Sequence, residues 1–71
     1  MRQLDLRHLP APEPFMLAID AADALAVGET IAVLTPLLPH PLLHALDVRG
    51  LQYQAEQYDA GGARILITRV Q

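Results

Sequence analysis

The sequence predicts an α+β fold: a two-layer α/β sandwich in which two helices cover one face of a four-stranded mixed sheet. Six segments alternate between strand-like and helix-like hydrophobic patterns, in the order β-α-β-α-β-β. A helical segment separates the first two strands, which favours parallel pairing through a right-handed crossover. A short glycine turn separates the last two strands, which favours an antiparallel hairpin. We expect residues 1–71 to form a single domain, because the chain is too short for a second one.

The first half of the chain provides a strand and a helix. Residues 4–7 alternate apolar and polar side chains, as a strand with Leu4 and Leu6 facing inward would. Prolines at positions 10, 12 and 14 break this strand and suit the first turn of a helix, where backbone N–H groups lack partners. The helix is expected from Phe15 to Ala26 and to end at Gly28. Its inward face is predicted from the helical spacing of Phe15, Ile19, Ala22 and Ala26.

The second half contains three strands and a shorter helix. Residues 30–35 are β-branched and apolar, which predicts a central strand. A proline-rich connection leads to a helix from about Pro41 to Gly50. Residues 51–56 alternate, with positions 51, 53 and 55 inward, and residues 63–70 form the closing strand. The face without helices is expected to carry Gln3, Asp5, Arg7, Gln52, Gln54 and Glu56.

Composition excludes several classes of function. The chain has no cysteine, which excludes disulfides, thiolate zinc sites and a cysteine nucleophile. Eight acidic residues against five basic ones, all arginine, argue against a nucleic-acid partner. We see no signal peptide and no membrane-spanning run, so we expect a cytoplasmic protein without a membrane partner. No catalytic motif or cofactor-binding motif is visible, so we expect neither an enzyme nor a bound cofactor.

Two segments carry a family resemblance over nearly the whole chain. Residues 4–14 resemble the Leu-Asp-x-x-Gly-x-x-Cys-Pro-x-Pro signature of the TusA/SirA-like sulfur carriers, and Gly28-Glu29 matches their Gly-Glu turn. The resemblance implies the sandwich fold and, in the carriers, a persulfide on the cysteine at the start of the first helix. In this chain Ala11 stands at that cysteine and His8 at the signature glycine. Because alanine has no nucleophile, persulfide relay by this mechanism is excluded.

The chain is more similar to an uncharacterised branch of this superfamily, a domain of unknown function associated with redox partners. That branch has Asp-x-Arg in its first strand, matched here by residues 5–7, and Asp-His-x-Pro-x-Pro-Leu after its second strand. The second motif is matched only by residues 39–42. Pro36 and Leu37 stand where the branch has its Asp and His.

Two groups of side chains are candidate binding residues. Asp5, Arg7 and Glu13 would form a polar cluster around Ala11 that suits an anion or a partner peptide. The alternative is that Asp5 pairs with Arg7 while Glu13 complements the helix dipole. Exposed leucines beside Ala11 would form an apolar rim for a protein partner. The full candidate set is Asp5, Arg7, His8, Ala11, Glu13, Leu37, Leu38 and His40.

Two histidines have the spacing of a metal site. His40 and His44 stand four residues apart, which places both on one helical face if the helix includes them. Asp47 is the one carboxylate nearby, and His40 precedes a proline. We therefore expect two solvated histidines, with metal binding as the alternative.

The sequence thus predicts a non-enzymatic accessory or interaction module in redox or sulfur-related metabolism, with a protein partner and with a homodimer as one arrangement. One alternative is a small-ligand or metal-binding domain that uses His8, His40 and His44. Another is a degenerate carrier that still docks on a sulfur-transfer partner.

Overall fold

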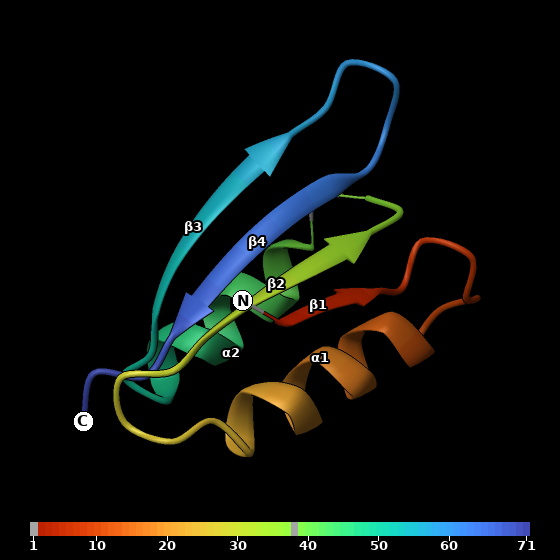
Figure 1. Cartoon of the computed structure of the whole chain (residues 1–71). Helices are drawn as coiled ribbons and strands as arrows, with labels where there is room; N and C mark the ends of the chain where they lie inside the picture. The colour runs from red at the N-terminus through yellow and green to blue at the C-terminus, as the bar shows by residue number, and fades with distance from the viewer. Residues whose placement is uncertain (1, 38) are drawn as a thin grey trace.

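A four-stranded sheet forms one layer of the molecule and two helices form the other, in a computed structural model that describes residues 2–37 and 39–71 (Figure 1). This confirms the predicted sandwich and its β-α-β-α-β-β order. The elements are β1 (Arg2–Asp5), α1 (Glu13–Asp23), β2 (Thr30–Thr35), α2 (His40–Val48), β3 (Gln52–Gln57) and β4 (Ala63–Thr68).

The strands lie in the order β1-β2-β4-β3. β1 runs parallel to β2, in a register that places Leu4 opposite Val33. β4 is antiparallel to both of its neighbours, β2 and β3. The predicted parallel pair and the predicted hairpin are therefore both present. β2 and β4 occupy the centre of the sheet, and β1 and β3 are its edges.

The core lies between the sheet and the helices. In β4, buried and partly exposed residues alternate strictly, because one face lies under the helices and the other does not. The central strand β2 is buried from Ile31 to Thr35. The sheet and helices together contribute Leu6, Ile31, Val33, Ile65, Ile67, Ala18, Ala22, Leu25, Leu42 and Leu46 to this core.

The first helix differs from its prediction in its ends and in its buried face. It runs from Glu13 to Asp23, so it begins two residues earlier and ends three residues earlier than expected. Ala18, Ala22 and Leu25 face the core, whereas Phe15 and Ala26 are exposed. The two alanines have short side chains, which lets the helix backbone approach the sheet. The larger Phe15 is then displaced toward the start of α2.

Three strands also differ from their predicted bounds. β1 ends at Asp5 because the Asp5 carboxylate accepts the backbone N–H of Arg7 and turns the chain there. β3 begins at Gln52 because the N–H of Leu51 donates to the carbonyl of Leu46 in α2. β4 ends at Thr68, after which the chain leaves the sheet. Ala55, predicted to face the core, is exposed because it lies on the outer edge strand.

The Gly28-Glu29 turn holds the end of α1 to the C-terminal segment. The Glu29 carboxylate accepts the backbone N–H of Ala26 at 2.6 Å. The Gly28 N–H donates to the carbonyl of Arg69 at 2.7 Å, and the Arg69 N–H donates to the carbonyl of Glu29. The Arg69 guanidinium also donates to the Ala22 carbonyl near the end of α1. These bonds join the turn, α1 and the segment that follows β4.

The face of the sheet without helices is polar at its edges but apolar at its centre. The predicted glutamines and acids on β1 and β3 are exposed there. The central strand β2, however, places Ala32 and Leu34 on this face, and they are only 1% and 7% exposed. Their neighbours in the sheet cover them without a helix above.

Candidate functional site

An apolar pocket of about 320 Å³ opens where α1 and α2 begin and β2 ends. Two segments far apart in the sequence form it, residues 11–15 and 35–42. Thr35 contributes the one polar side chain among the residues that line it. The lining residues are Ala11, Pro12, Pro14, Phe15, Thr35, Pro36, Leu37, Pro39, Pro41 and Leu42.

Five of the six prolines in the chain line this pocket. Pro12 and Pro39 occupy the N-cap positions of α1 and α2, and Pro14 and Pro41 follow in the first turns. A proline in the first turn fits helical geometry but has no N–H to offer a ligand. The N–H of Glu13 is already bonded to the carbonyl of Pro10. Prolines therefore form apolar walls at both helix ends and remove donors that an anion would use.

Thr35 does not make the pocket polar. Its side chain is buried, and its hydroxyl donates to the carbonyl of Leu37 at 2.7 Å. Gly62 packs behind it, so close that a Cβ atom there would lie 3.0 Å from the Thr35 carbonyl oxygen. The hydroxyl is thus hydrogen-bonded within the loop that forms part of the pocket wall.

The structure places only part of the predicted binding set at this pocket. Ala11 and Leu37 line it, and Leu37 is 75% exposed on its rim. Leu38 lies outside the described residues. The remaining candidates are all exposed but are not among the lining residues: Asp5, Arg7, His8, Glu13 and His40.

Asp5 and Arg7 form a bidentate ion pair rather than a cluster with Glu13. Arg7 Nε donates to Asp5 Oδ1 at 2.9 Å, and Arg7 Nη2 donates to Asp5 Oδ2 at 2.8 Å. These hydrogen bonds lower the pKa of Asp5 to about 2, and the same pairing raises the pKa of Arg7. Within the described ranges, no ion pair joins Glu13 to Arg7.

The histidines do not assemble a metal centre among the residues that the structure describes. His40 is the first residue of α2 and His44 lies one turn later, and both are exposed. Across residues 2–37 and 39–71, no three His, Asp or Glu side chains come together to hold a metal ion.

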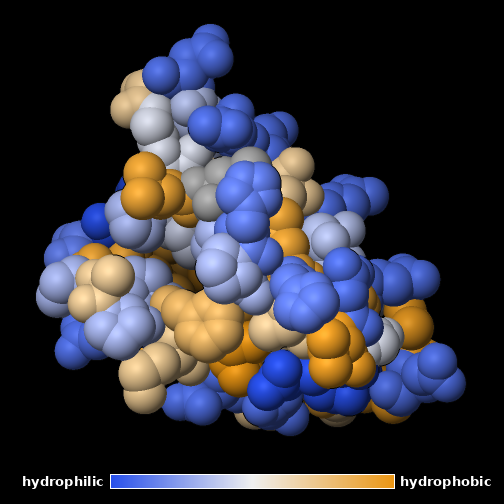
Figure 2. Space-filling model, turned by 180° about the vertical axis from the view of Figure 1, so that it is seen from behind, coloured by the Kyte–Doolittle hydropathy of each residue, from blue (hydrophilic) through white to orange (hydrophobic). Residues whose placement is uncertain are grey.

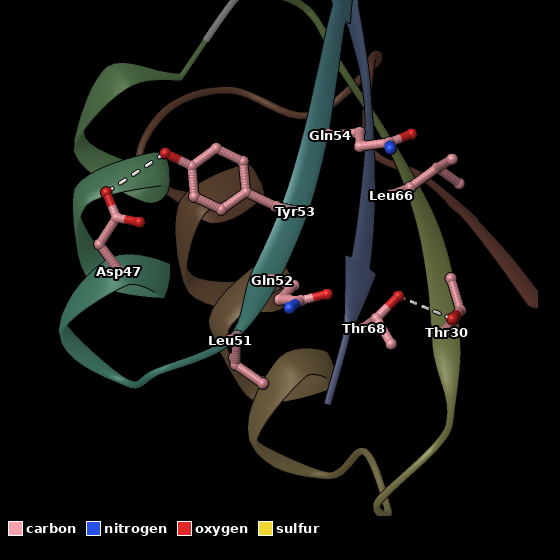
Figure 3. A pocket seen from close by; sticks show the side chains of 8 residues that line it. All are labelled: Thr30, Asp47, Leu51, Gln52, Tyr53, Gln54, Leu66 and Thr68. Atoms are coloured by element: carbon pink, nitrogen blue, oxygen red, sulfur yellow. Dashed lines mark hydrogen bonds between the residues drawn. The ribbon is translucent and has the colours of Figure 1, made fainter. Parts of the chain in front are cut away.

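A second, wider depression of about 620 Å³ lies along β3 (Figure 3). Tyr53 points toward α2, where its hydroxyl donates to Asp47 at 3.2 Å, whereas Gln52 and Gln54 point to the other face. Desolvation and the Asp47 carboxylate raise the pKa of Tyr53. The hydroxyls of Thr30 and Thr68 bond each other at 2.8 Å. Because several of its polar groups are already paired, this depression is the weaker candidate.

Other apolar side chains reach the surface singly or in small groups. Seen from behind, apolar atoms lie in separate patches between hydrophilic ones (Figure 2). The exposed large apolar residues of the described chain are Phe15, Met16, Leu17, Val27, Leu37, Val48 and Val70. Phe15 and Leu37 belong to the pocket, so exposed apolar groups there also line a cavity.

Ala11 and Leu37 could be predicted from the sequence as binding residues, but most of the pocket walls could not. A signal was present, because the six prolines fall in two clusters, positions 10–14 and 36–41, each before a helix. That the two clusters meet follows from the crossover between β1 and β2, which brings both helix starts to one end of the sheet. No helix in the described part of the chain is long and apolar enough to span a bilayer.

Comparisons with known proteins agree with this architecture. The model of the family described as "Uncharacterized conserved protein (DUF2249)" matches residues 3–69. The crystal structure of a SirA-like protein from Desulfitobacterium hafniense superposes with a TM-score of 0.77 at 23% identity, over 94% of this chain and 95% of that chain. No curated protein matches this sequence.

Proposed function

The chain belongs to the DUF2249 family of uncharacterised conserved proteins, and we propose that it acts as a non-enzymatic interaction module. Its pocket at Ala11 would receive an apolar side chain of a partner protein. The resemblance to sulfur carriers supports a role in redox or sulfur-related metabolism, as an accessory that binds without carrying sulfur.

One observation carries this proposal: the pocket stands at the position of the carrier cysteine and offers no reactive group. Ala11 contributes a methyl group, and the Thr35 hydroxyl is bonded within the loop. Covalent chemistry at this place would need a nucleophile that these side chains lack. Binding by burial of apolar surface needs nothing more than the walls that are present.

The size and charge of the pocket favour an apolar side chain over an anion. Its volume of about 320 Å³ is at the lower end of typical ligand sites, roughly 300–1,000 Å³. Burying one Leu or Phe side chain there is worth roughly 1.5–3 kcal/mol. An anion would meet the carboxylate of Glu13 in the first turn of α1 and the prolines that lack N–H groups.

The first test uses a small model of such a side chain. We expect N-acetyl-leucinamide, titrated into 15N-labelled protein, to shift the amide resonances of Phe15, Thr35 and Leu42. N-acetyl-glutaminamide serves as the polar control and should leave them in place. Equal shifts with both compounds, or shifts confined to β3, would contradict the proposal.

The second test compares two exposed aliphatic residues. One lies beside the start of α1 and the other follows its end. Leu37 is 75% exposed on the pocket rim, and Val27 is 66% exposed beyond the far end of the helix. We expect Leu37→Asp to lose a partner captured from the native cell, and Val27→Asp to retain it. If both variants lose the partner, the contact is not specific to the pocket. Turnover or covalent sulfur on the purified protein would overturn the non-enzymatic assignment.

A further inference from the structure

We propose that β3 pairs antiparallel with β3 of a second copy of this chain, so that two four-stranded sheets join into one continuous sheet. The proposal rests on the exposed edge of β3 and is independent of the pocket at Ala11. A two-fold axis normal to the sheet would relate the copies and keep all helices on one face.

The outer edge of β3 presents unpaired backbone groups. The N–H of Tyr58 donates to the carbonyl of Gly62 at 3.1 Å, continuing the register that pairs Gln57 with Ala63. In an antiparallel ladder the residues that bond the neighbour alternate with those that do not. Positions 52, 54 and 56 therefore bond β4. The N–H and C=O groups of Tyr53, Ala55 and Gln57 point away from the sheet, where a further strand would bind.

Of the two edges, β3 is the one without the usual protection. Natural edge strands avoid pairing through short length, lysine, proline or charged side chains. β1 has four residues and includes Arg2 and Asp5. β3 has six residues, with no proline and no lysine, and carries a single charge at Glu56.

The side chains of β3 are complementary to those of a second β3. Two registers pair the outward backbone groups. The register centred on Gln54 leaves the Gln57 carbonyl without a donor, because Leu51 opposite it already donates its N–H to Leu46, and the register centred on Ala55 uses all of them. In the first register Glu56 faces Gln52 of the other copy, and in the second it faces Gln54. Either way a carboxylate meets an amide that can donate to it, and no acid faces an acid.

The same pairing accounts for the exposure of Ala55. Its side chain is on the same face as that of Tyr53, because side chains two residues apart on a strand share a face, yet it is exposed. In the register centred on Gln54, Ala55 packs opposite Tyr53 of the second copy, and each ring covers one methyl group. An aromatic side chain opposite a small one on the same face is a favourable cross-strand pair. A small residue is also what a close strand contact requires.

The test is the oligomeric state and the amide protection of the purified full chain. We expect sedimentation equilibrium at high micromolar concentration to give twice the monomer mass of 7.8 kDa. Hydrogen exchange should protect the amides of Tyr53, Ala55 and Gln57 at that concentration and release them on dilution. A monomer with rapidly exchanging amides at these positions would overturn the proposal.

Matched variants locate the interface. Ala55→Lys places a charge at the pairing edge, and Ala55→Pro removes an N–H that bonds nothing within the sheet; both should yield monomers. Gln3→Lys makes the same change of charge on the other edge and should remain dimeric. Circular dichroism shows whether each variant is folded. If Ala55→Pro is unfolded, the oligomeric state of Ala55→Lys alone tests the proposal. A dimer that survives Ala55→Lys, or amide protection that appears only with a foreign protein, would show that β3 does not pair with itself.

Discussion

Ala11 presents a single methyl group at the edge of a pocket whose other walls are mainly proline, phenylalanine and leucine. In the sulfur carriers that the sequence resembles, a cysteine at this place depends on helix-terminal N–H groups to stabilise its thiolate. The carrier signature has the same prolines after its cysteine, and Glu13 at its variable position adds a negative charge here. A carboxylate therefore stands two residues from the position where the carriers hold a thiolate.

Restoring the cysteine tests those surroundings. We expect the thiol of the Ala11→Cys variant to titrate near the ordinary cysteine value of about 8.5, because the Glu13 carboxylate opposes the anion that the start of α1 would otherwise favour. The rate of alkylation by iodoacetamide, measured against pH, gives this pKa. A strongly depressed pKa, together with uptake of persulfide from a cysteine desulfurase, would favour the degenerate-carrier alternative.

The Asp5–Arg7 ion pair should make the free energy of unfolding depend on pH in the acid range. The Asp5 pKa is about 2 in the folded protein against an ordinary value of 3.8, so the pair stabilises the fold above about pH 4. That contribution is lost as the pH falls toward 2. We expect the free energy of unfolding of Asp5→Asn to fall less steeply over this range than that of the wild type. Urea denaturation at successive pH values measures it, with Asp59→Asn as a control that removes a carboxylate outside this ion pair.

At the scale of elements, prolines and glycines mark where helices and turns begin and end. Each helix follows prolines, and the chain turns after α2 at Gly50 and between β3 and β4 at Gly61 and Gly62. These local signals were visible in the sequence and the corresponding elements are present. The face that α1 turns to the core was predicted correctly at Ile19 and Ala22 but not at Phe15 and Ala26, because its exact orientation depends on how closely Ala18 and Ala22 approach the sheet.

Two of these glycines form a matched pair for measurement. Gly50 and Gly62 both have positive φ, but only at Gly62 would a Cβ atom meet backbone, the Thr35 carbonyl at 3.0 Å. Alanine at either position loses roughly 1–2 kcal/mol through the left-handed conformation. Gly62→Ala should lose a further ~1–3 kcal/mol through the tight contact. Equal losses in urea denaturation would show that the contact relaxes freely.

At the scale of the whole molecule, a chain of 71 residues has a small margin of stability. The usual range per residue corresponds to roughly 4–11 kcal/mol for a domain of this length. One contiguous core between the sheet and two helices supplies it. A single core residue can therefore decide whether the protein is folded, whereas a residue on the pocket rim cannot.

Leu46 and Leu37 separate these two cases. Leu46 is fully buried, so Leu46→Ala should lower the free energy of unfolding by about 2–5 kcal/mol. Leu37 is mostly exposed, so Leu37→Ala should change it by no more than about 0.5 kcal/mol. Urea denaturation of both variants measures the difference. A large loss in Leu37→Ala would mean that the rim is structural rather than free for binding.

Most of the fold could be predicted from the sequence because its signals are local. Alternation along residues 51–56, helical spacing after Pro14 and the glycine turn at 61–62 each act over a few neighbours. The order of elements and the parallel pairing of the first two strands follow from them. The candidate site was predicted only at Ala11 and Leu37, since its other walls come from segments whose meeting no local pattern records.

The sequence by itself determined the type of domain, the order of its elements and the absence of cysteine from residues 1–71. Tertiary structure decided that two proline clusters enclose one apolar pocket, which of the two arrangements predicted for Asp5 and Arg7 is present, and that β3 is an edge. The physical reason is that secondary structure depends on neighbours along the chain. Pockets, ion pairs and sheet edges depend on which distant segments the packing of the core brings together.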